Sequence, residues 1–255
     1  MSGATIGVAS ATSAPFGRPS VLLVGVAHVL DLEAGLDRVL GAFQPRALAV
    51  ELDAERAQVL LERVQERKAG GAGERPSGRS TGAPVLLRLW AHLQDRFASQ
   101  MGGVPGEEML QAAAFARRKE LPCFLVDDAL SQVAPRLLGS LTGKEKVKLL
   151  VSTAVALFIP AKLVQGEIGE YSAHRDEYLE VMREQYPTLT RVLLDERNVH
   201  MAARIQGLAV QYGRVAAVVG DAHVAGLSQV LSAGGLGVEK AHLETVVAGA
   251  KPTSA

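Results

Sequence analysis

The chain has 255 residues, of which 48% are apolar, and its 27 basic residues balance 27 acidic ones to give zero formal net charge. This length and composition predict a folded domain with a sizeable core and exclude general disorder. A neutral chain also disfavours nucleic-acid binding, because that function relies on a basic surface to neutralise phosphates.

Cysteine content and hydropathy indicate in which cellular environment the chain folds. Cys123 is the one cysteine, so the sequence predicts neither an internal disulfide nor a cysteine metal site. We interpret it as a small buried hydrophobe in a strand, in a reducing compartment that is cytoplasmic or otherwise intracellular. No apolar run reaches the roughly 18–20 residues of a membrane span. Peripheral membrane contact, organellar association and a homodimer stay open.

The first part of the chain alternates short apolar runs with segments of helical periodicity. Residues 1–19 are rich in Ser, Ala and Thr and predict a disordered leader. Two strands and two helices then follow in the order strand, helix, strand, helix, over residues 21–24, 31–43, 47–50 and 54–68. Asp31 and Asp53 are candidate N-caps of the two helices. This order predicts parallel strands joined by a right-handed crossover.

The remainder of the chain contains more helix than strand. A Gly-rich linker is expected over residues 69–84, followed by helices over 85–100 and 106–119 and by a strand around Cys123 that ends at Asp127. The last predicted segments are a helical insertion over about 131–207, a strand over 215–219, a helix over 225–233 and a strand over 238–247. The expected fold is therefore α/β: one domain over residues 20–250, with a mixed, partly parallel central sheet flanked by helices.

A short motif, Gly-x-x-His, occurs twice in matching contexts. It appears as Gly25 to His28 and as Gly220 to His223, each time after an apolar strand and before a helix. Glycine allows a tight exit from the strand, which would present each histidine above the edge of the sheet. Two neutral histidines hydrogen-bonded in a packed core are the alternative interpretation.

Glu51 directly follows the second strand, which is an unfavourable place for an unpaired charge. With His28 and His223 it forms a His/His/carboxylate set suited to zinc, manganese or iron. Three protein ligands leave a position for water, whose pKa a bound metal lowers. Alternatively, Glu51 is an ordinary strand-end residue paired with an arginine.

Further charged residues are candidates for the same site. Asp127 ends the third strand, and Glu107 and Glu108 begin a helix, where the helix dipole by itself explains acidic residues. Arg197 lies in the charged run from Asp195 to Asn198. It is either part of a solvated face or a group that binds a developing oxyanion.

The order of these motifs resembles the TraB/PrgY family. The resemblance rests on five segments in sequence, at residues 24–28, 45–56, 105–109, 195–201 and 218–227, and covers nearly the whole chain. The family is similar to the TIKI metalloproteases and to the erythromycin-esterase and ChaN-like groups. Here Asp221-Ala222 replaces the more usual small residues before the second histidine.

The resemblance implies an active centre that contains His28, Glu51 and His223, with Arg197 and Glu107 or Glu108 near it. It also implies a divalent ion (manganese, cobalt or zinc) and a peptide or protein substrate. The leading hypothesis is therefore a metal-dependent hydrolase, of peptidase type, in which Glu51 is either a ligand or the general base. Two alternatives remain: a non-catalytic module that binds a peptide or protein, and a haem- or iron-handling protein.

Overall fold

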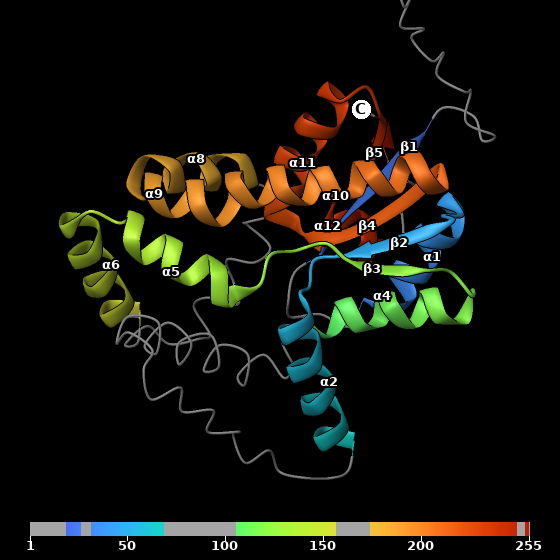
Figure 1. Cartoon of the computed structure of the whole chain (residues 1–255), viewed down its shortest axis with the longest axis horizontal. Coiled ribbons are helices and arrows are strands. Elements are labelled where there is room, and N and C mark those ends of the chain that lie inside the picture. Colours follow the sequence, from blue (N-terminus) through green and yellow to red (C-terminus); the bar gives the residue numbers. More distant parts are fainter. Residues whose placement is uncertain (1–18, 27–31, 69–105, 157–173, 249–252, 255) are drawn as a thin grey trace, which may run out of the picture.

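The structure is a computed structural model that describes residues 19–26, 32–68, 106–156, 174–248 and 253–254. Outside these residues lie 1–18 of the predicted leader, the linker over 69–84, the helix over 85–100, Asp31 and His28. The described part is an α/β fold with a central sheet between layers of helices (Figure 1). This confirms the predicted fold class.

The sheet has the strand order β3-β2-β4-β1-β5-β6. Its strands are β1 (Ser20–Val26), β2 (Ala47–Val50), β3 (Cys123–Leu125), β4 (Arg214–Gly220), β5 (Gly237–Ala241) and β6 (Thr253–Ser254). The first five run parallel, and β6 pairs antiparallel with β5, so the sheet is mixed. The two early strands are parallel, as predicted, but β4 lies between them.

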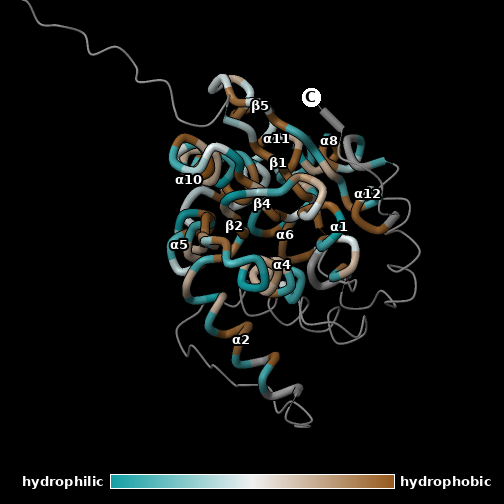
Figure 2. Tube along the Cα trace, turned by 90° about the vertical axis from the view of Figure 1, so that its right-hand side faces the viewer, coloured by the Kyte–Doolittle hydropathy of each residue, from teal (hydrophilic) through white to brown (hydrophobic). Residues whose placement is uncertain are grey.

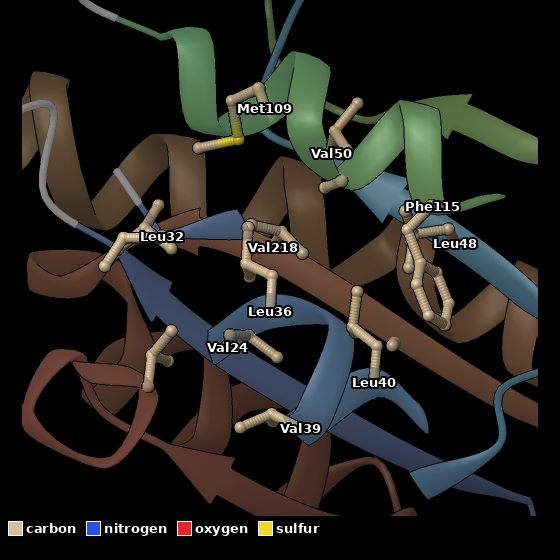
Figure 3. Packing of buried hydrophobic residues seen from close by; sticks show 14 of the residues in the cluster. Val24, Leu32, Leu36, Val39, Leu40, Leu48, Val50, Met109, Phe115 and Val218 are labelled. Atoms are coloured by element: carbon tan, nitrogen blue, oxygen red, sulfur yellow. The ribbon is translucent and has the colours of Figure 1, made fainter. Parts of the chain in front are cut away.

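Helices cover both faces of the sheet. On one face, α1 (Glu33–Phe43), α4 (Glu107–Arg118) and α12 (Leu243–Ala248) pack against strand residues that include Val24, Leu48 and Val218 (Figure 3). On the other face, α10 (Glu196–Tyr212) and α11 (Asp221–Ala233) enclose the alternate strand residues. The three central strands β1, β2 and β4 are therefore buried on both sides. Each buried Val or Leu side chain contributes roughly 1.5–3 kcal/mol.

Between β3 and β4 the described chain is almost entirely helical. It forms α5 (Leu130–Ser140), α6 (Gly143–Ala156), α8 (Arg175–Gln185), α9 (Pro187–Thr190), the π-helix η1 (Arg191–Asp195) and α10. Val133, Leu137, Leu141 and Val192 form a small separate core in this region. The breaks expected near residues 143 and 187 occur there, and α10 continues past Gly207 to Tyr212. Among the described helices none is both long and apolar enough to cross a membrane.

Three local predictions differ from the structure. The strand expected over 238–247 ends at Ala241, and α12 follows, because Leu243 and Val246 face the core at helical spacing. Helix α11 begins at Asp221 instead of Ala225. Cys123 is exposed instead of buried, because β3 is the last strand on its side of the described sheet.

Helix α2 (Ala54–Lys68) extends away from the sheet (Figures 1 and 2). Its predicted N-cap is confirmed, because Asp53 Oδ1 accepts hydrogen bonds from the backbone N–H groups of Glu55 and Arg56, at 2.9 and 3.0 Å. Leu60 anchors the first half of the helix in the core of the face that carries α4. The cap thus fixes α2 directly beside the strand end that carries Glu51.

Candidate active site at the carboxyl edge of the sheet

The carboxyl ends of the parallel strands meet at one edge, and the predicted site residues that the structure describes gather there. The connection after β1 passes through α1 to β2 on one face, and the connection after β4 passes through α11 to β5 on the other. Neighbouring strands whose connections diverge in this way create the crevice in which α/β proteins bind ligands. Strands β1, β2 and β4 run parallel and therefore all end on this edge.

Buried acidic side chains are concentrated at this edge. Six carboxylates are buried among the described residues, and they are Glu51, Asp53, Glu108, Asp127, Asp128 and Asp221. All of them follow a strand or begin a helix at the carboxyl edge, where α4, α10 and α11 have their N-termini. Burial of so many anions requires donors or cations nearby.

Glu51 is the most constrained of these carboxylates. It is 7% exposed, and its Oε2 accepts a hydrogen bond from the backbone N–H of Gly220 at 2.6 Å. Its Oε1 accepts one from Arg197 Nη2 at 2.6 Å and lies 3.3 Å from His223 Nε2. Glu51 is therefore buried, and it pairs with an arginine as the alternative interpretation of this residue expects.

The surroundings of Glu51 favour its charged form. Burial by itself would raise the pKa of this carboxyl, but His223, Arg197 and the Gly220 N–H together hold the pKa well below its usual value. Glu51 is thus an anion at neutral pH, which is the state that a metal ligand or a general base requires.

His223 lies in the first turn of α11 and not in a turn before the helix, which corrects the sequence-based expectation. Its Nδ1 is 2.7 Å from Asn198 Oδ1. Because a carboxamide oxygen can only accept, this contact places the hydrogen on Nδ1 and directs Nε2 towards Glu51. Sequence reasoning did not identify Asn198 as a site residue.

Arg197 connects Glu51 to a second carboxylate. Its Nε donates to Asp127 Oδ1 at 2.9 Å, its Nη1 donates to the Leu193 carbonyl at 2.9 Å, and its Nη2 bonds to both Asp127 and Glu51. Arg197 stays charged, and despite its burial the two carboxylates raise its pKa. Most of its N–H groups are therefore engaged by the protein, which favours a positioning role over direct contact with an oxyanion.

The π-helix η1 ends immediately before the helix that carries Arg197 and Asn198. π-Helical turns are rare and occur frequently at functional sites, because the wider turn changes the direction in which the following residues point. Here the Leu193 carbonyl, inside η1, accepts the Arg197 hydrogen bond. The irregular turn thus helps to orient the guanidinium.

Arg56 extends this network into α2. It pairs with Asp127 through Nη2 and with Asp53 through Nε. Asp127 therefore lies between two guanidinium groups, Arg56 and Arg197, and its own side chain is 1% exposed. Burial lowers the pKa of Arg56, but Asp127 and Asp53 outweigh this effect and raise it. Sequence reasoning treated Asp53 only as a helix cap and did not identify Arg56.

Glu107 and Glu108 occupy the first turn of α4, as predicted. Glu108 is 2% exposed and Glu107 is half-buried. Because α4 leads directly into β3, it runs antiparallel to the strands, and its N-terminus lies at the same edge as Glu51. The structure therefore places both acids at the predicted edge.

Asp221, the additional carboxylate of the second motif, packs against β1. Its Oδ1 lies 3.0 Å from His242 Nδ1 and accepts a hydrogen bond from the Leu243 N–H at 3.3 Å. A Cβ added at Gly25 would be 2.1 Å from the same oxygen. The glycine of the first motif thus makes room for a carboxylate from the second.

Two of the three predicted metal ligands are described, and the distance between their facing atoms would allow either a direct hydrogen bond or a shared ion. Ligand atoms about 2.1 Å from a tetrahedral ion are about 3.4 Å apart. The separation of His223 Nε2 and Glu51 Oε1 is 3.3 Å. The Nδ1 contact with Asn198 is the type of support that metal-bound histidines have. Within the described residues no cluster of three or more His, Cys, Asp or Glu side chains is arranged for metal binding, and His28 lies outside them.

Comparison with known proteins supports the resemblance stated from the motifs. The model of the TraB/PrgY/gumN family matches residues 13–239, a range that includes every predicted site residue. An uncharacterized protein of Methanocaldococcus jannaschii is 28% identical to this chain over 212 residues. The aligned region is 83% of this chain and 53% of that relative, so the chain spans about half of the relative's length.

Proposed function

The chain belongs to the TraB/PrgY/gumN family, and from the geometry of its carboxyl-edge site we propose that it is a metal-dependent hydrolase of peptide bonds. The observation that carries this proposal is the buried pair of Glu51 and His223, whose facing atoms are 3.3 Å apart. With hydrogen on Nδ1, the Nε2 lone pair faces a carboxylate oxygen. Such a pair requires a cation between the two atoms, either a proton on Nε2 or a metal ion.

The proposed ligands are His223, Glu51 and His28. Val26, two residues before His28, pairs in the sheet with Gly220, three residues before His223, so the two motifs leave adjacent strands at the same level. The two guanidinium groups of Arg56 and Arg197 pair with three carboxylates, those of Glu51, Asp53 and Asp127, which leaves one negative charge to attract a divalent cation. Manganese, cobalt and zinc are the candidate ions.

A divalent ion in this site would polarise the scissile carbonyl and lower the pKa of bound water. Other protein side chains would hold and orient the ligands of this ion. Asn198 fixes the His223 ring, and Arg197 holds the Glu51 carboxylate at 2.6 Å in its charged form. Glu51 serves as a ligand or as the general base.

The peptide substrate follows from the resemblance to the TIKI metalloproteases. We place the activity in a reducing intracellular compartment, because Cys123 is the one cysteine of the chain.

Metal content tests the proposal directly. The wild-type protein, purified without chelator, should contain about one divalent ion per chain by elemental analysis, and His223→Ala should lose most of it. His174→Ala is the matched control, because His174 is 56% exposed and lies at the start of α8. Removal of the ion with EDTA should abolish peptide cleavage, and manganese, cobalt or zinc should restore it. Equal metal content in the wild type and His223→Ala would refute the proposed ligand set.

A non-catalytic peptide- or protein-binding module is the second candidate. It is favoured by the fact that both oxygens of Glu51 already accept hydrogen bonds from protein donors, as expected of a purely structural network. In that case the double variant His28→Ala/His223→Ala would retain the metal content of the wild type, and a peptide would bind without being cleaved.

A further inference from the structure

A cavity of about 200 Å³ adjoins the site on the Nδ1 side of His223. Helix α8, η1, α10 and α11 form its walls, with Leu179, Leu194, Asn198, Ala222, Ala225 and Gly226 among the lining residues. Asn198 is the residue that holds His223, and Ala222 directly precedes it. The cavity and the proposed metal ligands thus share a wall.

Asn198 presents an unused donor to this cavity. The residue is 4% exposed, and its Oδ1 is engaged by His223. Its Nδ2 has no hydrogen-bond acceptor within the part of the chain that the structure describes. Gly226 makes room for this group, because an added Cβ there would be 2.2 Å from Nδ2. A ligand in the cavity that carries an acceptor would pair with this N–H group.

The size and lining of the cavity indicate what that ligand is. Ligand pockets for whole small molecules are about 300–1,000 Å³, whereas engineered apolar cavities of about 150 Å³ hold a group as large as benzene. A volume of about 200 Å³ therefore suits one aliphatic side chain with its adjoining carbonyl. The two charged lining residues, Glu180 and Arg183, are opposite in sign and exposed, so the cavity has no net charge to select an ionic group.

We propose that this cavity is a substrate subsite that accepts a small aliphatic residue of a peptide, whose carbonyl oxygen receives a hydrogen bond from Asn198 Nδ2. The assignment of a peptide as the ligand rests on the proposed function. Asn198 then has two tasks, since one end of its carboxamide orients His223 and the other end binds the substrate. The selected residue would lie next to the scissile bond.

Binding of N-acetyl-L-leucinamide to the full chain tests the subsite without requiring cleavage. The Asn198 side-chain NH₂ resonances are followed by NMR and are assigned by their loss in Asn198→Asp, which keeps an acceptor for His223 Nδ1. We expect a saturable shift of these resonances in the wild type. Ala225→Leu, which fills the cavity from an exposed position on α11, should weaken binding at least tenfold. Ala233→Leu, the same change at an exposed alanine later in α11 that does not line the cavity, should bind as the wild type does.

The subsite is refuted if the Asn198 resonances show no saturable shift, or if Ala225→Leu binds the amide as tightly as Ala233→Leu. The proposed hydrolase activity is judged separately, from cleavage of peptides that contain leucine or valine. Binding at Asn198 without cleavage would leave the subsite intact and contradict the hydrolase. Cleavage that is equally fast in Ala225→Leu for glycine and for leucine peptides would contradict the subsite alone.

Discussion

Replacement of Glu51 by glutamine tests the central network most sharply. The two carboxylate oxygens accept from Arg197 Nη2 and from the Gly220 N–H, both at 2.6 Å. Glutamine keeps one acceptor, so its NH₂ must face one of these donors. The change also removes the negative charge that balances a guanidinium with 13% exposure.

The expected loss of stability follows from this geometry. Breaking a buried ion pair costs roughly 3–5 kcal/mol. Because the oxygen of the introduced carboxamide can still accept one of the two hydrogen bonds, we expect Glu51→Gln to lower the free energy of unfolding by about 3 kcal/mol. For a chain of this size, that loss corresponds to a decrease in Tm of roughly 6–12 °C.

Urea denaturation followed by circular dichroism measures this loss. The experiment is run in EDTA at pH 7, so that a change in metal affinity does not contribute. Glu33→Gln is the matched control, because Glu33 is 56% exposed and pairs with Arg118 at 3.2 Å on the surface. It should change stability by no more than about 1 kcal/mol. If Glu51→Gln were as stable as Glu33→Gln, the buried network would not have the strength argued above.

The effect of Glu51→Gln on stability should depend on pH. The folded protein lowers the pKa of Glu51 below its usual value of 4.5, so the stabilisation by its carboxylate is fully present above that pH. It is lost as the pH falls from 4.5 towards the folded-state pKa. The stability difference between the wild type and Glu51→Gln should therefore narrow below pH 4.5. If this stability difference widened below pH 4.5, the direction assigned to the pKa shift of Glu51 would be wrong.

Three further substitutions, two of them with a matched control, test other parts of the edge. Gly25→Ala should lower stability by about 1–3 kcal/mol through overpacking, whereas Gly41→Ala, in a helix with no atom within 4 Å of the added Cβ, should raise it by about 0.5–1 kcal/mol. Arg197→Lys should lower peptide cleavage and stability, because an ammonium cannot replace the guanidinium fork. Arg191→Lys, at an exposed ion pair, should change neither. Asp53→Ala should cost about 0.5–2 kcal/mol in urea denaturation, through loss of the α2 cap. If Gly25→Ala were as stable as Gly41→Ala, or if Arg197→Lys matched Arg191→Lys in cleavage and stability, the contact assigned to Gly25 or to Arg197 would be wrong. An Asp53→Ala variant as stable as the wild type would contradict the role of Asp53 as a cap.

The local pattern of the sequence determined where the strands end and which chemical groups follow them. Continuous apolar runs predicted β1, β2 and β4, and the residue types after these runs singled out Glu51 and the second Gly-x-x-His. The strand predictions succeeded because hydrophobic periodicity is a property of a few adjacent residues. The ordered motifs likewise identified the family.

Tertiary structure decided which residues meet. Glu51 contacts Arg197 across 146 positions, and Asp127 contacts Arg56 across 71. No local pattern encodes such pairings, because they depend on β4 inserting between β1 and β2 and on helix N-termini that converge at one edge. The role of Asn198 is also invisible in sequence, since a polar residue in a helix normally faces solvent. Only packing against Gly226 and His223 buries it, because the glycine leaves space and the histidine supplies a hydrogen-bond donor.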